Sequence, residues 1–323
     1  MAKRKKTHPG SALATVLGGL ALAAACLWWL AGSPELSPEQ LAQQAMEYLS
    51  QTVSSSYQQQ EALPPAEGEL RVHMIDVGQG DSILIQTAEE AVLIDSGEAE
   101  YGDTVSDYLK SQGVEKLDLV MATHPHSDHM GSMAQIVADW PVEEFMMPIV
   151  PESLTPTSRV YENLLDALEE KELSITQPEA GTVYDLGSGA RLTILAPVGE
   201  DYDNLNDWSI VCRVDFGETS FLFTGDSEKP VERDLLESGA QLDADLLKVG
   251  HHGSSTSTGK TFLRAVSPDT AFISCGIGNR YGHPNQSTLD TLEEEGVEIW
   301  RTDISGSVVA VSDGSEISII SQR

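Results

Sequence analysis

Cysteine is scarce in this chain of 323 residues. It contains three, Cys26, Cys212 and Cys275, and no two of them form a CxxC pair. This spacing argues against a disulfide framework and against a cysteine-ligated zinc site. Cys212 and Cys275 lie in apolar runs typical of strands, which favours small buried side chains with no chemical role.

Basic residues are the second shortage. The chain has 19 Lys and Arg against 51 Asp and Glu, for a net charge of −32. Four of the basic residues are Lys3, Arg4, Lys5 and Lys6, so the remainder carries 15 basic against 51 acidic residues, a net charge of −36. Such a surface repels phosphate polymers at long range, and a phosphate ligand would need a metal or a local basic patch to bind.

Acidic residues are absent before Glu35. Within this region, the uncharged run 11–31 has 21 residues, which is long enough to span a bilayer as a helix. Trp28 and Trp29 stand near its far end, where interfacial aromatic residues gather. Because the basic residues precede the run, residues 1–32 are expected to form a cytoplasmic tip and a membrane anchor, with the rest of the chain outside the cell.

A cleaved signal peptide is the alternative to this anchor, because the small residues 23–25 suit a signal peptidase; a lipid-modified Cys26 is another. The anchor is preferred, since either alternative would leave the apolar residues 27–30 at the mature terminus. Residues 33–68 are rich in Ser, Gln, Glu and Pro and predict a polar linker. The globular domain is then expected at residues 69–323.

The densest polar cluster is the segment THPHSDH at residues 123–129, which holds three His and one Asp. It follows the run 117–122, which predicts a short buried strand. His124 and His126 are two residues apart, so in an extended segment they project to the same side. Asp128 and His129 follow where the chain turns. Neutral imidazole and carboxylate suit Zn, Mn or Fe(II), so this loop predicts ligands for two metal ions.

Three further polar clusters follow predicted strands, at residues 224–226 (TGD), 251–255 (HHGSS) and 281–284 (YGHP). Helices and strands alternate in both halves, which predicts an α/β protein with two sheets covered by outer helices. Polar groups at strand ends are where ligand sites form in layered α/β folds. Strands are expected at 70–76, 81–86, 91–95, 117–122, 191–195, 209–216, 219–223, 246–249, 270–274, 297–301, 308–311 and 317–320, and helices at 104–112, 130–140, 160–171, 229–237, 260–265 and 287–295.

Taken together, these motifs resemble the metallo-β-lactamase superfamily. Residues 124–129 match its HxHxDH signature, residues 93–97 (LIDSG) its early Asp motif, Asp226 its bridging Asp, and His251 with His252 its late His motif. The phrases DVGQGDS, THxHxDHxG, TGD, HHGS and GHP recur in the C-terminal domain of the ComEC competence proteins and occur here in that order. The resemblance spans roughly residues 70–322 and leaves out that family's multi-span channel.

The resemblance implies an αββα four-layer sandwich with two divalent metal ions, Zn or Mn, along one edge. It assigns His124 and His126 to metal one. It assigns Asp128, His129 and a late His to metal two, with Asp226 bridging both ions. His251 and His252 are both candidates for the late ligand; His251 is the expected ligand, and His252 the expected active-site group.

Other residues are expected to support this centre. Asp95 should orient the metal-loop backbone or a ligand His, and Asp76 and Asp81 should brace the glycine turn between them. Many superfamily members supply a third His to metal one, but no His lies between residues 129 and 251 here. Asn206 or Asp207 lies where that ligand is expected, and an oxygen donor or water there would make Mn a rival to Zn.

The implied chemistry is metal-dependent hydrolysis, in which two ions activate water and hold the substrate oxygens. Asp128, His252 and His283 are the expected catalytic residues, with His283 protonating the leaving group or binding a phosphate oxygen. Four basic residues near the motifs are expected to seat one or two phosphates, but hardly a long duplex. These are Lys248, Lys260, Arg264 and Arg280.

The sequence thus predicts an extracellular, membrane-anchored phosphodiesterase or nuclease of the ComEC-like branch, with DNA as one candidate substrate. Two alternatives stay open. One is a hydrolase of another extracellular ester, such as a cell-wall phosphodiester or a lactone. The other is a non-catalytic binding module that keeps the fold. The sequence indicates no protein partner.

Overall fold

The computed structural model of the chain describes residues 64–199 and 201–323. The expected anchor at residues 1–32 and the linker up to residue 63 therefore lie outside the described residues. Within the described ranges, no helix is both long and apolar enough to cross a membrane.

Two mixed sheets form the centre of the domain. In spatial order, the first contains β15 (Ile317–Ser321), β14 (Val308–Ser312), β1 (Leu70–Met74), β2 (Ile83–Gln86), β3 (Ala91–Ile94), β4 (Leu117–Met121), β5 (Val142–Met146) and β6 (Ile175–Thr176). The second contains β13 (Glu298–Arg301), β12 (Thr270–Ile273), β11 (Leu246–Lys248), β10 (Thr219–Phe223), β9 (Val211–Phe216), β8 (Arg191–Ala196) and β7 (Val183–Asp185).

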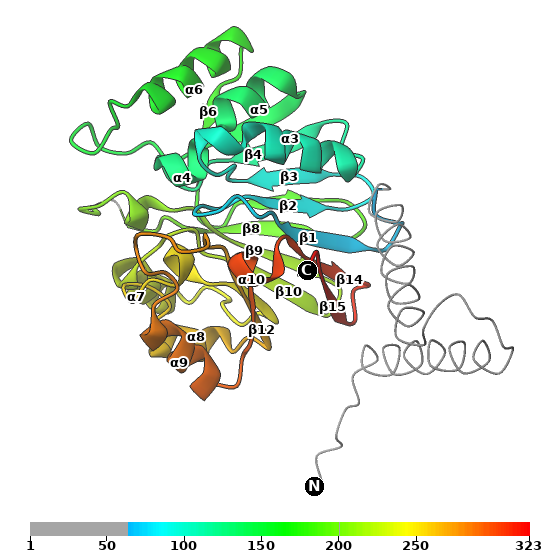
Figure 1. The fold of residues 1–323 in the computed structure, drawn as a ribbon, viewed down its shortest axis with the longest axis vertical. Helices are drawn as coiled ribbons and strands as arrows, with labels where there is room; N and C mark the ends of the chain where they lie inside the picture. Colours follow the sequence, from blue (N-terminus) through cyan, green and yellow to red (C-terminus); the bar gives the residue numbers. More distant parts are fainter. Residues whose placement is uncertain (1–63, 200) are drawn as a thin grey trace, which may run out of the picture. The chain divides into compact units, whose positions relative to one another are not determined.

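Helices cover the outer face of each sheet, so the domain has four layers (Figure 1). A core of apolar residues such as Val72, Ile194 and Phe221 fills the space between the sheets. Over the first sheet lie α3 (Gly102–Ser111), α4 (Ser127–Met130), α5 (Met133–Asp139) and α6 (Arg159–Glu170). Over the second lie α7 (Lys229–Ser238), α8 (Lys260–Val266) and α9 (Gln286–Glu294). The short α10 (Thr302–Ser305) follows β13, and single 3-10 turns are η1 (Ala99–Tyr101), η2 (Asn206–Trp208) and η3 (Gly250–Gly253).

This arrangement confirms the expected αββα sandwich. The short strands β6 and β7 and the short helix α10 were not expected from the sequence, and two further elements also differ. Strand β5 was not expected, because Glu143 and Glu144 interrupt its apolar run; here Lys116 pairs with Glu143, and the Tyr184 hydroxyl donates to Glu144. The helix expected at 130–140 is the shorter α5, and the end of the 123–129 loop before it forms a separate short helix, α4. The two helices are separated at Gly131, where a β-carbon would collide with the Ser127 carbonyl and the Ala99 amide.

The sheet topology explains why the polar clusters converge. Strands β3, β4 and β5 run parallel in the first sheet, and β10, β11, β12 and β13 run parallel in the second. Asp95, the 123–129 loop, Asp226 and the 250–253 turn follow the carboxyl ends of β3, β4, β10 and β11 in turn. Carboxyl ends of parallel strands share one sheet edge, so residues far apart in sequence meet there.

Candidate metal centre

The HxHxDH segment forms a loop and the short helix α4 at the end of β4. His124 and His129 are fully buried, whereas His126 and Asp128 border solvent. The Nε2 atom of His124 lies 2.8 Å from the Nδ1 atom of His126. The extended backbone of His126, with φ −89° and ψ 151°, brings the two rings to the same side, as their spacing in the sequence predicts.

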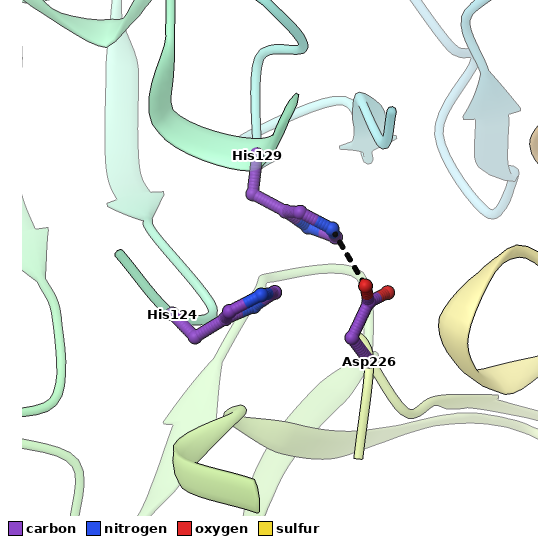
Figure 2. Close-up of side chains that lie close together, drawn as sticks. All are labelled: His124, His129 and Asp226. Atoms are coloured by element: carbon purple, nitrogen blue, oxygen red, sulfur yellow. Dashed lines mark ion pairs between the residues drawn. The ribbon is translucent and has the colours of Figure 1, made fainter. Parts of the chain in front are cut away.

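Asp226 enters the same space from the turn after β10. Its Oδ2 atom lies 3.3 Å from Nε2 of His129 and 3.5 Å from Nε2 of His252. Figure 2 shows the rings of His124 and His129 and the carboxylate of Asp226 facing one another; their donor atoms lie within 4.8 Å of each other. A second such group joins Asp128, His129 and His252. The loop after β4 and the turns after β10 and β11 therefore supply one cluster.

The hydrogen-bond inventory of this cluster fits a metal. Buried polar atoms in folded proteins almost always have a hydrogen-bond partner. Three atoms that could bind a metal are buried here without a hydrogen-bond partner: Nε2 of His129, Nε2 of His252 and Oδ1 of Asp226. Nitrogen and carboxylate oxygen are the donors that Zn and Mn accept. The residues present therefore fit the divalent ions that the sequence motifs imply.

The other nitrogen of each buried ring is held by an acceptor. Oδ2 of Asp95 lies 2.7 Å from Nδ1 of His129, and its Oδ1 accepts the backbone N–H of Thr123 at 2.8 Å. Nδ1 of His252 lies 3.0 Å from the carbonyl oxygen of Ser274. In both rings Nδ1 must carry the proton, which leaves Nε2 as the ligand atom. Asp95 thus contacts both the backbone of the 123–129 loop and the candidate ligand His129, the two partners that the sequence left open.

Charge in the cluster strongly favours a cation. Burial lowers the pKa of an imidazole, but the Asp226 and Asp95 carboxylates outweigh it and hold the pKa of His129 well above its usual range. Burial is likewise overcome at His252, where Asp226, Asp128 and Asp81 raise the pKa to about 10. For the Asp226 carboxyl, burial alone would raise the pKa, yet His252 and His129 hold it well below its usual range. The site is a pocket of negative charge that a metal ion would neutralise.

The positions of His251 and His252 differ from the expectation that His251 is the metal ligand. His252 is buried, and its Nε2 lies 3.5 Å from the carboxylates of both Asp128 and Asp226. His251 is part-exposed, belongs, like His126, to none of the four donor groups found in the described residues, and lies 3.7 Å from Asp226. Both residues have left-handed backbones, with φ 49° and 53°, which sends their rings in different directions. The geometry therefore favours His252 as the ligand.

His251 is held instead by a residue that sequence reasoning missed. Its Nδ1 lies 3.2 Å from Oε1 of Glu228, which also accepts from Thr256 Oγ1 and Asn206 Nδ2. Glu228 lies directly before α7 and two residues after Asp226. Only this proximity to the TGD motif could have pointed to it in the sequence. The pair presents Nε2 of His251 toward the cavity above the cluster.

That cavity has a volume of about 240 Å³ and opens over the cluster. His283 lines it, as expected, together with Tyr281, Gln79 and Ser127. The His283 ring stacks on Tyr281 with centroids 5.8 Å apart, and its Nδ1 has no hydrogen-bond partner. Burial and the neighbouring His251 and His252 lower its pKa to about 4.

Asn206 and Asp207, the two candidates to replace the missing third His, lie in different environments in the structure. Asn206 lines the cavity, and its Oδ1 is buried without a partner. Asp207 faces a different cavity, and its carboxylate accepts from the Glu228 amide and from Asn204 Nδ2. An oxygen ligand for metal one can therefore come from Asn206 but not from Asp207.

We predict that Asn206→Ala weakens binding of one of two metal equivalents by about tenfold, because one oxygen donor is lost, and leaves the other unchanged. Isothermal titration of Mn or Zn into the full chain measures both equivalents. Asn204→Ala, an amide two residues away that lines the other cavity, is the matched control. Equal affinities in wild type and Asn206→Ala would assign that position to water.

Among the four basic residues expected to seat phosphates, three are already engaged. Lys248 is fully buried and lies 2.6 Å from the Asp81 carboxylate, so the prediction that it seats a phosphate is wrong. Lys260 pairs with Glu294, and Arg264 with Glu295. Arg280 lies over the Tyr281 ring, 4.9 Å from its centroid, and makes no ion pair within the described residues. One cation thus remains near the cavity rim.

Comparison with known proteins agrees with this architecture. A family model described as the metallo-beta-lactamase superfamily matches residues 75–277. The chain is 31% identical over 261 residues to ComE operon protein 3 of Bacillus subtilis strain 168. The matched region covers 75% of this chain and 33% of that protein. It is 31% identical over 250 residues to competence protein ComA of Neisseria gonorrhoeae, covering 77% of this chain and 33% of that protein.

The chain thus spans about a third of the length of these curated relatives. Among solved structures, the metallo-beta-lactamase fold protein YhfI from Bacillus subtilis superposes with a TM-score of 0.47 at 13% identity. That match covers 75% of this chain and all of the other.

Proposed function

This chain belongs to the metallo-β-lactamase superfamily, and from that premise we propose that its globular domain is a metal-dependent phosphodiesterase of the ComEC-like branch. One observation carries the proposal. The loop after β4 and the turns after β10 and β11 bring nitrogen and carboxylate ligand atoms together, and three of these atoms are buried without a hydrogen-bond partner. Such a set serves no purpose in packing, because burying unpaired polar atoms costs stability.

In this proposal the residues divide between two ions. His124, His126 and Asn206 would hold the first, and Asp128, His129 and His252 the second, while Asp226 would contact both. Two divalent ions held this way supply a nucleophilic water near neutral pH and stabilise negative charge on a substrate oxygen. His251 and His283 line the cavity opposite the ligands and would bind the substrate or carry a proton to its leaving group.

The rim of the cavity supports a small anionic substrate. Arg280 is the one basic side chain of the four near the motifs that makes no ion pair. Its guanidinium lies over the half-exposed Tyr281 ring, on which His283 also stacks, so the rim offers one cation held against an aromatic ring. Such a cation suits a single phosphate. The long phosphate backbone of a duplex needs several Lys or Arg, whereas three of the four basic residues near the motifs are already paired with carboxylates.

We predict that a small diester such as bis-p-nitrophenyl phosphate is cleaved at a rate nearly independent of salt. Long DNA should be cleaved poorly at low salt, and its cleavage should rise severalfold toward about 0.1 M salt, where the Debye length is about 10 Å and repulsion is screened. A panel of both substrates and a lactone, assayed with the metal-loaded full chain, measures this.

A steep fall of DNA cleavage with salt would reveal a basic groove and favour a nuclease. Hydrolysis of the lactone alone would overturn the phosphodiesterase in favour of another ester hydrolase. No hydrolysis of any substrate, with both metals bound, would favour a binding module.

We further propose that residues 11–31 anchor the domain outside the cell, on the evidence of their length, their missing charges and the basic residues before them. Protease added to intact cells is expected to release the domain, because the positive-inside rule keeps residues 3–6 cytoplasmic. Protection from protease would reverse this topology. A mature chain that begins near Cys26 would replace the anchor with a signal peptide.

A further inference from the structure

A buried ion pair lies directly behind the metal cluster. Lys248 is the last residue of β11, and Asp81 closes the glycine turn between β1 and β2. Nζ of Lys248 lies 2.6 Å from Oδ2 of Asp81, with side-chain exposures of 0% and 1%. The desolvation free energy of two buried charges often exceeds their mutual attraction, so apolar side chains of similar volume would usually stabilise the fold as well or better. The pair therefore needs an explanation other than packing.

The pair touches every turn that carries a proposed ligand of the second metal. Nζ of Lys248 donates to the carbonyl oxygen of Gly225, directly before Asp226, at 3.3 Å. Oδ1 of Asp81 lies 3.4 Å from Nδ1 of His252, and the Asp81 amide donates to the carbonyl oxygen of Asp128 at 3.1 Å. The Lys248 ammonium, the Asp81 carboxylate and the Asp81 backbone amide thus join three turns that are far apart in the sequence.

The glycine before Asp81 makes this approach feasible. Gly80 has φ 155°, and a β-carbon there would collide with the carbonyl oxygen of Asp128. The turn can therefore press its backbone against α4 only with glycine at this position. This gives the residues 76–82 phrase a role beyond chain reversal: it brings a carboxylate to the rear of His252.

Asp81 also lies close enough to compete for the metal. Its carboxylate is within 4.8 Å of ligand atoms of Asp226 and His252. Its Oδ2 atom lies 2.6 Å from the Lys248 ammonium and its Oδ1 atom 3.4 Å from Nδ1 of His252, so Lys248 is its charge partner. With Lys248 in place, that carboxylate faces the ammonium and stays behind the imidazole. Without Lys248, it would be free to turn toward the cation and displace the His252 ring.

From these contacts we infer that Lys248 and Asp81 are positioning residues for the second metal. The pair fixes His252, Asp128 and Asp226 relative to one another and keeps Asp81 out of the ligand set. This inference rests on the proposed metal-dependent function. It assigns a role to the buried lysine that the motif comparison left without one.

The test uses the full chain and three variants: Lys248→Met, Asp81→Asn and the double variant. Calorimetric titration with Zn or Mn counts the equivalents, and the absorption spectrum of cobalt(II) reports the geometry of each. Both single variants should keep the first equivalent and weaken the second by about 10- to 100-fold, the usual cost of losing an outer partner of a ligand. The cobalt spectrum of the second equivalent should change with it.

The double variant separates positioning from folding. Replacing both members of a buried ion pair leaves no uncompensated charge, so this variant should unfold at or above the temperature of either single variant. Its second metal should nevertheless stay weak. Two wild-type equivalents with an unchanged cobalt spectrum in the double variant would overturn the inference and leave the pair a purely structural role, even if the single variants fail to fold.

Two further variants complete the design. Lys110→Met removes an exposed lysine of α3 and should change neither equivalent. Asp128→Ala removes a proposed ligand and should lose the second equivalent. If Asp128→Ala loses that metal while Lys248→Met and the double variant keep it, only the positioning role fails. If Asp128→Ala keeps both metals at wild-type affinity, the proposed metal centre itself is wrong.

Discussion

Asp226→Ala is expected to lower the rate of hydrolysis by at least about a thousandfold and to leave less than one tightly bound metal per chain. The Oδ2 atom of Asp226 lies within 3.7 Å of ring nitrogens of His129, His251 and His252, so no other carboxylate is as central. Metal ions contribute several kcal/mol of transition-state stabilisation, and about 4 kcal/mol corresponds to a factor of roughly a thousand. Elemental analysis and the diester assay measure both effects.

The matched control for this prediction is Asp107→Ala. Asp107 lies on α3 with a side chain that is 79% exposed, and it pairs only with Lys110. Its removal should leave metal content and rate within twofold of wild type, because an exposed pair of this kind contributes little. A fully active Asp226→Ala variant with two bound ions would show that the carboxylate does not contact the metals and that the assignment is wrong.

Removal of the metals by a chelator is expected to lower the unfolding temperature by about 10 °C or more. An ion present at 100 to 1,000 times its Kd stabilises the folded state by about 3–4 kcal/mol, and each kcal/mol shifts the unfolding temperature of a domain this large by about 2–4 °C. The physical reason is local: Asp95 and Asp226 are nearly fully buried around His129, and a bound cation would neutralise these carboxylates, whereas Asp81 already has Lys248 as its partner.

Thermal unfolding of the full chain, with and without chelator, tests this prediction. Adding back Zn or Mn should restore the transition, and two equivalents should suffice. The Asp226→Ala variant provides the comparison, since it should show a much smaller shift on chelation. An unfolding temperature that does not respond to chelator in the wild-type chain would contradict a resident metal and would favour a binding module.

Much of this architecture can be predicted from the sequence because its signals are local. Strands β4 and β10 contain short apolar runs, β1 alternates apolar with polar residues, and α6 and α7 have a clear helical period, so neighbouring residues alone indicate them. The donors of the 123–129 loop are likewise local, because two-residue spacing in an extended segment is enough to align His124 with His126. Strand β5 escaped this logic because its two glutamates find partners only in the folded sheet.

The sequence by itself determined which chemistry is present: the imidazoles, the carboxylates and the strand ends that carry them. The tertiary structure decided which of these groups act together. Left-handed backbones turn the adjacent rings of His251 and His252 apart, and no pattern of residue types specifies that direction. Asn206 and Asp207 are adjacent oxygen donors in the sequence, and only the fold shows that they face different cavities. Lys248 is paired with a residue 167 positions away, in a contact that exists only when both sheets are assembled around it.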